Sequence, residues 1–147
     1  MVPQLLLIMM GLPRSGKTTW AKAEAHVLNA VIVSPDCIRL SLHGKPYIHS
    51  MEPYVWSIAR TMVESLFHAG HEAVILDATM TTKRARDKWE DMDPVWHYID
   101  TPCRTCVERA MGTDSKYLVP VIEDMAKHFE PLGDGEFTYN TDYGKPI

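Results

Sequence analysis

The sequence predicts an α/β fold in which a parallel sheet of four or five strands carries helices on both faces. Short apolar runs alternate along the chain with longer segments whose apolar residues recur at helical spacing. This alternation is typical of parallel strands joined by right-handed helical crossovers. Strands are expected at residues 4–10, 30–34, 73–77 and 95–99, with at most one more near 137–139.

Helices are expected to follow the strands in turn, because residues that start or stop helices stand between the apolar runs. Pro35 marks the entry to a short helical piece, Gly70 ends a long helix, and Thr81 or Thr82 is a candidate N-cap. Residues 43–53, with two prolines and a glycine, are expected to form a loop. The expected helices are 18–28, 36–42, 54–69, 82–91, 103–111 and 119–129.

Length and charge limit the function classes. We expect the 147 residues to form a single domain, since this length is sufficient for one hydrophobic core. The net charge of −4 means that the chain as a whole does not attract polyanions, so any contact with nucleic acid must use a local patch. The apolar run at residues 5–10 is too short for a signal peptide or a membrane span. We therefore expect a cytoplasmic protein that does not bind membranes; a phage-encoded chain would act in the host cytoplasm.

Three cysteines, Cys37, Cys103 and Cys106, are an odd number and fit reduced thiols. The spacing Cys103-x-x-Cys106 has two interpretations. A structural zinc site needs four ligands, and the sequence has no second pair with metal spacing, although His97 lies nearby. Packing at the start of a helix is the interpretation that we favour.

A phosphate-binding loop follows the first predicted strand. Residues 11–18 match the pattern G-x-x-x-x-G-K-[ST] at every fixed position, and a predicted helix follows them. Such a loop surrounds a triphosphate with backbone N–H groups and a helix N-terminus. We expect Lys17 to bind the β- and γ-phosphates of ATP or another nucleoside triphosphate, and Thr18 to bind Mg²⁺. The predicted nucleotide-binding residues are Gly11, Leu12, Pro13, Arg14, Ser15, Gly16, Lys17, Thr18 and Thr19.

Asp77 ends the third predicted strand. A buried parallel strand directs its last residue towards the edge of the sheet where ligands bind. The carboxylate is therefore a candidate to hold Mg²⁺ directly or through water, or to orient a substrate group. The alternative is that Asp77 only caps a helix.

Asp36 and Arg39 follow the second predicted strand, three residues apart, which places both side chains on one face of a helical turn. A kinase needs a base for the attacking hydroxyl and a cation near the acceptor's own charge. The alternative is structural: Asp36 caps the turn and Arg39 is solvated.

Together, these motifs resemble the kinase domain of phage-type polynucleotide 5′-hydroxyl kinases and related, AAA-like P-loop kinases. The matching features are residues 11–21, Asp36-x-x-Arg39, the strand ending in Asp77, and Arg109 before a polar segment. The resemblance implies a P-loop NTPase-type sheet with Asp36 as the general base, Arg39 on the acceptor, and Arg109 in a lid at about residues 104–118. It also implies ATP and Mg²⁺ as cofactors.

The sequence departs from this family pattern in two places. Arg14 stands where relatives usually have glycine, which adds a cation beside the phosphates but constrains the loop backbone. The second lid arginine is replaced by residues such as Thr113 and Asp114. Lys116 is a candidate substitute, though an ammonium lacks the guanidinium's fork, and Arg104 is another.

We therefore expect a kinase that acts on the 5′-hydroxyl of DNA or RNA. A second possibility within the class of kinases is an enzyme that phosphorylates a small molecule, a nucleoside or a hydroxymethylated base in DNA. The alternative from another class is a nucleotide-dependent regulatory or toxin-like protein. The sequence leaves the acceptor and the oligomeric state open. Basic residues at 83–88 are either a nucleic-acid patch or a solvated helix face, and Tyr139 and Tyr143 are candidates to stack on adenine.

Overall fold

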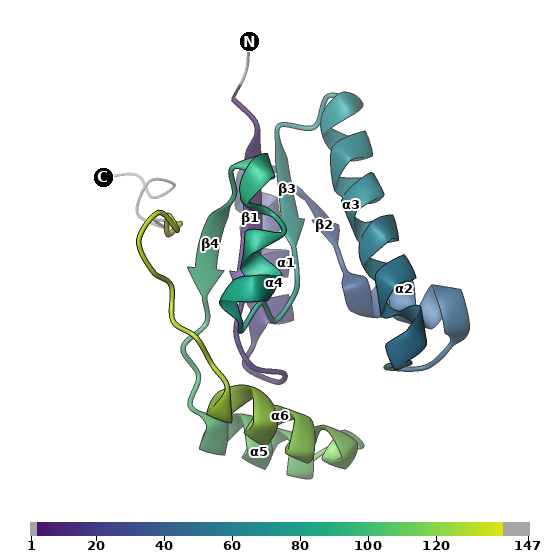
Figure 1. The fold of residues 1–147 in the computed structure, drawn as a ribbon, viewed down its shortest axis with the longest axis vertical. Coiled ribbons are helices and arrows are strands. Elements are labelled where there is room, and N and C mark those ends of the chain that lie inside the picture. Colours follow the sequence, from purple (N-terminus) through teal and green to yellow (C-terminus); the bar gives the residue numbers. More distant parts are fainter. Residues whose placement is uncertain (1–2, 140–147) are drawn as a thin grey trace.

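The computed structural model describes residues 3–139 and contains a parallel sheet of four strands within that range. The strands are β1 (Leu5–Met10), β2 (Val31–Val33), β3 (Ala73–Leu76) and β4 (Val95–Tyr98), in the spatial order β2-β3-β1-β4. β1 therefore lies inside the sheet (Figure 1), where Leu7 pairs with Ile75 of β3 and with Val95 of β4. The α/β fold and its four predicted strands are confirmed.

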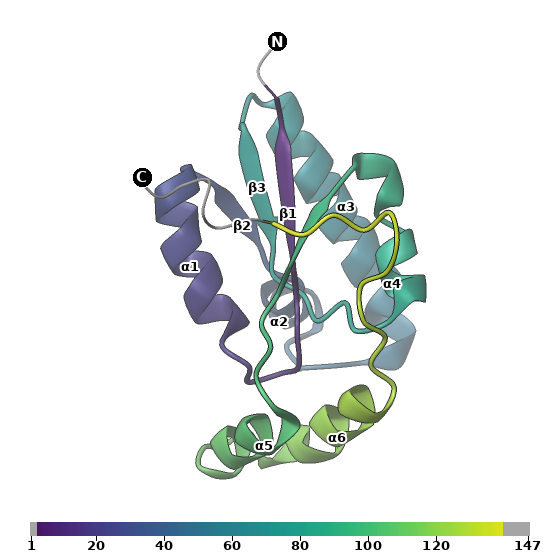
Figure 2. The same cartoon turned by 90° about the vertical axis from the view of Figure 1, so that its left-hand side faces the viewer.

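The fifth expected strand is reduced to a single bridge. Thr138 lies parallel to Trp96 of β4, where the Trp96 N–H donates to Phe137 O at 2.8 Å and the Tyr139 N–H donates to Trp96 O at 2.7 Å. These contacts cover the outer edge of β4 with the end of the described chain, the yellow segment in Figure 2. Tyr143 lies outside the described residues.

Helices cover both faces of the sheet, as expected (Figures 1 and 2). On one face, Ala21 of α1 (Lys17–Leu28) packs with Leu7 and Met9. On the other face, Val55 and Ala59 of α3 (Glu52–His68) pack in a second cluster that includes alternate residues of β1. Because both faces are covered, β1 is apolar throughout, as is usual for a parallel strand.

Two helix boundaries differ from the prediction. The expected loop at residues 43–53 contains the 3₁₀ helix His49–Met51 and the first turn of α3, since Pro53 occupies a position where a missing N–H is tolerated. The expected helix 82–91 is split into α4 (Lys83–Asp87), capped by Thr82, and the 3₁₀ helix Glu90–Met92. At the split, the Trp89 N–H donates to Arg86 O, a tighter pairing than in an α-helix.

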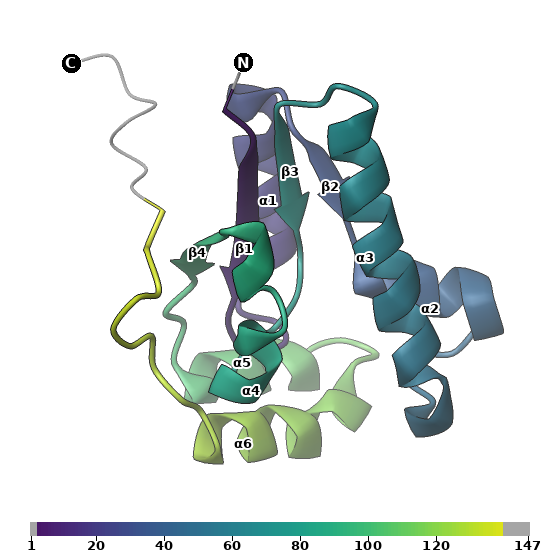
Figure 3. The same ribbon diagram turned by 45° about the horizontal axis from the view of Figure 1, so that its top comes forward.

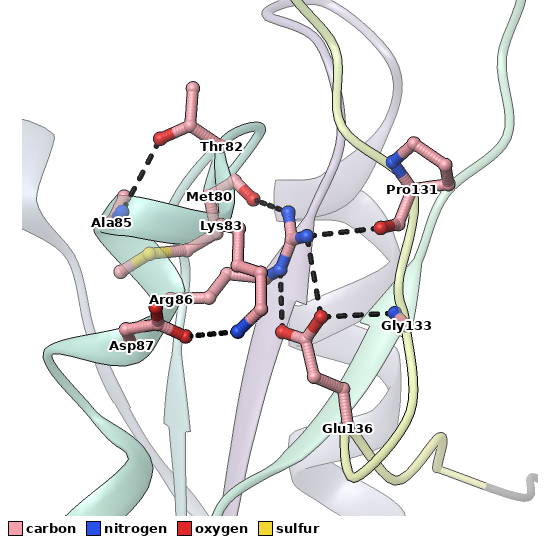
Figure 4. A network of polar contacts seen from close by, with 9 residues as sticks. All are labelled: Met80, Thr82, Lys83, Ala85, Arg86, Asp87, Pro131, Gly133 and Glu136. Carbon is pink, nitrogen blue, oxygen red and sulfur yellow. Dashed lines mark hydrogen bonds and ion pairs between the residues drawn. The ribbon is translucent and has the colours of Figure 1, made fainter.

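Arg86 of α4 is completely buried, so the basic segment 83–88 is not a uniform surface patch. Figure 4 shows its guanidinium surrounded by acceptors: Nε and Nη2 donate to Glu136, Nη1 to Met80 O and Nη2 to Pro131 O. The Nε–Oε2 distance is 2.7 Å, and the side chain of Glu136 is 2% exposed. This network ties the segment after α6 to α4, and Arg86 is not accessible to a nucleic-acid strand.

Replacing Arg86 with methionine is expected to destabilise the fold by about 3–5 kcal/mol, because it leaves the buried Glu136 carboxylate unpaired. The matched control is Lys83→Met in the same helix, where Lys83 forms a half-exposed pair with Asp87 and little change in stability is expected. Denaturant unfolding measures both variants. Equal stabilities would contradict a structural role for the Arg86 network.

The stability that this network contributes to the fold depends on pH. Burial raises the pKa of Glu136, but hydrogen bonds from Arg86 and the Gly133 N–H, together with the charge of Arg86, outweigh it and hold the pKa below its ordinary value of 4.5. The carboxylate therefore contributes stability that is complete above the unfolded-state pKa and is lost as pH falls through the folded-state pKa.

Two further helices, α5 (Cys103–Met111) and α6 (Val119–Lys127), pack against each other at the end of the sheet where β1 leads into the phosphate-binding loop (Figure 3). Cys106, Ala110 and Ile122 from this helix pair form a small core with Leu12 of the loop. Within residues 3–139, no helix is both long and apolar enough to span a membrane.

Candidate active site

The phosphate-binding loop joins β1 to α1 and depends on a glycine at its start. Gly11 has φ +155°, and a Cβ added there would meet Ile99 O and Ser15 Oγ at 3.0 Å each. The Gly11 N–H donates to Thr79 O at 2.9 Å, and the Thr101 hydroxyl donates to Ser15 O at 2.8 Å. The loop is thus held by the segments that follow β3 and β4.

Arg14 adopts a left-handed backbone conformation with φ +66°, which costs an L residue other than glycine roughly 1–2 kcal/mol. This agrees with the expectation that an arginine constrains the loop where glycine is usual. The side chain is exposed, and the Arg14 carbonyl accepts a hydrogen bond from Arg109.

Lys17 is buried at the first turn of α1, with 8% of its surface exposed. Its Nζ donates to Leu12 O at 2.7 Å. Burial lowers the pKa of Lys17 below its ordinary value, while the charges of Asp77 and Asp36 act in the opposite direction. The hydroxyl Oγ of Ser15 is also buried and has no hydrogen-bond partner among the described residues. An ammonium and an unpaired hydroxyl in a loop at a helix N-terminus suit a phosphate chain.

Thr18 and Asp77 lie together, as predicted from their positions at a helix start and a strand end. The Thr18 hydroxyl donates to Asp77 Oδ2 at 2.7 Å. Residues 3–139 contain no cluster of three or more His, Cys, Asp or Glu side chains suited to a metal ion. A hydroxyl and one carboxylate fit Mg²⁺, because this ion keeps several waters and takes phosphate oxygens as its other ligands.

Asp36 and Arg39 both lie on α2 (Pro35–His43), and the geometry corrects the structural alternative. Ser34, not Asp36, caps the helix by accepting from the Cys37 N–H at 3.2 Å. Arg39 is not solvated, since its side chain is 15% exposed, and its Nη1 donates to Asp36 Oδ1 at 2.7 Å. The Asp36 side chain is 85% exposed and thus accessible.

Glu52 is the residue at this site that the sequence analysis missed. Its carboxylate accepts from Arg39 Nε at 3.0 Å and from Nη2 at 2.6 Å, a fork-to-fork contact between α2 and α3. Burial lowers the pKa of Arg39, but the hydrogen bonds and charges of Glu52 and Asp36 raise it above its ordinary value. No local pattern links Arg39 to Glu52, because they are 13 residues apart across the segment expected to be a loop.

The predicted lid, residues 104–118, corresponds to nearly all of α5, the turn after it and the 3₁₀ helix Lys116–Leu118. Arg109 of α5 lies against the loop, where its Nη1 donates to Arg14 O at 3.1 Å and is 3.9 Å from the position of a Cβ added at Gly16. Arg104 is 90% exposed and pairs with Glu108 on its own helix. Lys116 is exposed. Of the three lid candidates, Arg109 is the one in contact with the phosphate-binding loop.

Replacing Arg109 with alanine is expected to weaken ATP binding or slow phosphoryl transfer by about 10-fold or more, because it removes a guanidinium beside the loop. Arg104→Ala is the matched control on the same helix and is expected to resemble the parent. Titration of ATP into each variant, followed by steady-state kinetics, makes the comparison. If Arg104→Ala lost more than Arg109→Ala, the lid assignment would be wrong.

Tyr139, a candidate to stack on adenine, and Cys106, of the Cys103-x-x-Cys106 spacing, both make contacts within the protein. The Tyr139 hydroxyl donates to Glu24 at 2.7 Å, and its ring meets Trp20 and His97 edge-on, so this tyrosine is engaged at the edge of α1. Burial, followed by Glu24, raises the pKa of Tyr139. Cys106 is buried in the core between α5 and the loop, with Sγ 3.8 Å from Thr101 O.

Comparisons with known proteins agree with this fold. The AAA domain family model AAA_33 matches residues 6–132. Shikimate kinase of Corynebacterium diphtheriae is 24% identical over 131 residues, covering 86% of this chain and 75% of that protein. The structure of a sugar kinase from a Janibacter species has a TM-score of 0.68 at 20% identity and covers 93% of this chain and 84% of its own.

A structure of the Pnkp1/Rnl/Hen1 RNA repair complex also matches, with a TM-score of 0.65 and 22% identity over 88% of this chain. The present chain spans about half of that longer chain, 47% of its length. At these identities the solved structures bear on the fold alone. Because the family model covers most of the sequence, the chain belongs to the AAA domain family, with the fold of a P-loop kinase.

Proposed function

We propose that this protein transfers the γ-phosphoryl group of ATP to an alcohol hydroxyl in a Mg²⁺-dependent reaction. The observation that carries the proposal is the position of Asp36. Its exposed carboxylate is held by Arg39 on the helix that follows β2. The end of β2 adjoins Asp77, the partner of Thr18, because the Asp77 N–H donates to Val33 O at 2.9 Å. In this proposal, an acceptor base and the phosphate-binding loop therefore serve one site.

Each residue has a distinct task in this proposal. Lys17, Ser15 and the backbone of residues 11–18 bind the phosphates, and Arg109 adds positive charge from the lid. Thr18 and Asp77 would hold Mg²⁺, which when bound neutralises charge on the phosphate oxygens. Asp36 accepts the proton of the acceptor hydroxyl as the oxygen attacks phosphorus, and Arg39 keeps the carboxylate in place.

The first candidate acceptor is the 5′-hydroxyl of DNA or RNA. The Asp36-x-x-Arg39 element and the phosphate-binding loop resemble those of polynucleotide kinases, and the similar fold of the Pnkp1 complex is consistent with this acceptor.

A second candidate is an uncharged small molecule or nucleoside, and the Arg39 site favours it. The guanidinium is already compensated by the carboxylates of Asp36 and Glu52, so an acceptor phosphate would meet a site with two negative charges and one positive charge. The burial of Arg86 further reduces the basic surface available to a polynucleotide. The similar fold of a sugar kinase is consistent with this class.

A panel of acceptors separates these candidates. The protein is incubated with γ-labelled ATP and Mg²⁺ and with a 5′-hydroxyl DNA, a 5′-hydroxyl RNA, a nucleoside, the matching nucleoside 3′-phosphate and hydroxymethylated DNA. A 5′-phosphorylated DNA of the same sequence is the negative control. Label on the 5′-hydroxyl strands supports the polynucleotide assignment, whereas preference for the nucleoside over its 3′-phosphate supports the second candidate. Labelling of none of them, or of the control equally, would contradict the proposal of a hydroxyl kinase with these acceptors.

A further inference from the structure

Arg39 has two carboxylate partners, and they hold it differently. Glu52 accepts hydrogen bonds from two of the guanidinium nitrogens, Nε at 3.0 Å and Nη2 at 2.6 Å, whereas Asp36 accepts one from Nη1 alone. The side chains of Arg39 and Glu52 are each 15% exposed, and that of Asp36 is 85% exposed. Glu52 is therefore the fixed partner and Asp36 the accessible one.

The arrangement is supported from α3. Glu52 and Trp56 lie one turn apart on this helix, and Arg39 Cζ is 5.9 Å from the centre of the Trp56 ring. The guanidinium is thus bound on its edge by a carboxylate and lies near an aromatic ring, both from the same helix. α2 and α3 pack together, so the position of Arg39 is set by an element other than its own.

Three of the five guanidinium N–H groups are used by these carboxylates, since the fork to Glu52 takes two and Asp36 takes one. Without Glu52, Arg39 would lose two of its three hydrogen bonds and regain the rotamer freedom of a long side chain. Asp36 would then be an exposed carboxylate tied to a mobile partner, and its geometry relative to the acceptor hydroxyl would be less defined.

We propose that Glu52 is a positioning residue of the acceptor site: it fixes Arg39 through the bidentate contact, and Arg39 in turn holds Asp36 in the orientation needed to accept the proton. Glu52 acts through Arg39 and does not touch the acceptor. This inference rests on the proposed function, because the value of a fixed Asp36 depends on its use as a base.

The test replaces Glu52 with glutamine, which keeps the size of the side chain but can accept with only one of its two end atoms. Glu64→Gln is the matched control, since Glu64 accepts from Arg60 on the same helix at 2.8 Å, in an exposed pair outside the site. We expect kcat to fall about 10-fold or more in Glu52→Gln, with the Kd for ATP unchanged, and Glu64→Gln to match the parent. Glu52→Asp, which keeps the carboxylate fork, is expected to recover part of the loss.

A double-mutant cycle distinguishes positioning from a general structural effect. If Glu52 acts through Asp36, Glu52→Gln should cause no further loss of transfer when Asp36 is already asparagine. A loss of the same factor in both backgrounds, or a Glu52→Gln variant as active as the parent, would overturn the inference.

A readout that does not need activity keeps the two proposals separate. The Arg39 Nε–H is held by Glu52, so its NMR signal should be protected from exchange in the parent and in Asp36→Asn but not in Glu52→Ala, which has no acceptor at this position. If the signal stays protected in Glu52→Ala, the positioning proposal fails whatever the activity. If the signal behaves as expected but the parent transfers phosphate to no acceptor, it is the proposed function that fails.

Discussion

Replacing Lys17 with alanine is expected to reduce phosphoryl transfer by at least about 10²-fold while the fold remains intact. The ammonium is buried in the phosphate-binding loop and donates to Leu12 O, so it is held beside the position that the phosphates would take. Its removal takes away the positive charge that stabilises the transferring group. The comparison is made by single-turnover transfer from γ-labelled ATP, with thermal unfolding as the check on folding.

Lys22→Ala is the control for this experiment. Lys22 lies on the same helix, α1, but its side chain is exposed. We expect this variant to transfer phosphate at the parental rate. A folded Lys17→Ala variant with near-normal activity would show that the loop does not bind the reacting phosphates.

Asp36→Asn is expected to lower transfer by roughly 10²–10⁴-fold with little change in ATP affinity. The amide oxygen can still accept the hydrogen bond from Arg39, so the side chain keeps its position but cannot take a proton. Helix α2 should remain capped, because the cap is Ser34. The values of kcat, KM for the acceptor and Kd for ATP are measured together.

Ser34→Ala provides the complementary control. It removes the N-cap of α2 and is expected to reduce stability by about 1 kcal/mol while the base remains present. Loss of transfer in Ser34→Ala without loss in Asp36→Asn would mean that the element after β2 is only structural.

The parts of the site that the sequence predicted are those defined by short-range patterns. The loop from Gly11 to Thr18 is one continuous motif, and Asp77 stands at the end of an apolar strand, so the parallel sheet brings Thr18 and Asp77 together. The spacing of Asp36 and Arg39 likewise predicted that they share one face of a helical turn, where the structure shows them in contact.

The missed features depend on contacts between distant segments. Arg86 reads as one of several surface cations on a charged helix, and only its pairing with Glu136, 50 residues later, makes it a core residue. Glu52 lies beside a proline that suggested a loop, yet Pro53 fits the first turn of α3 and Glu52 thereby reaches Arg39. In both cases a charged side chain is shielded from solvent, completely for Arg86 and largely for Arg39, beside a partner that no periodicity or motif indicates.

The most direct test of a phosphotransferase is the fate of the γ-phosphate. With γ-labelled ATP, Mg²⁺ and the preferred hydroxyl acceptor from the panel, label on the acceptor and label released as inorganic phosphate are measured in the same reaction. The account predicts that the parent places most of the label on the acceptor and that Asp36→Asn forms this product at least about 10²-fold more slowly. A parent that releases the label as inorganic phosphate at a rate unaffected by the acceptor and by Asp36→Asn would contradict it, and would indicate a nucleotide-dependent switch.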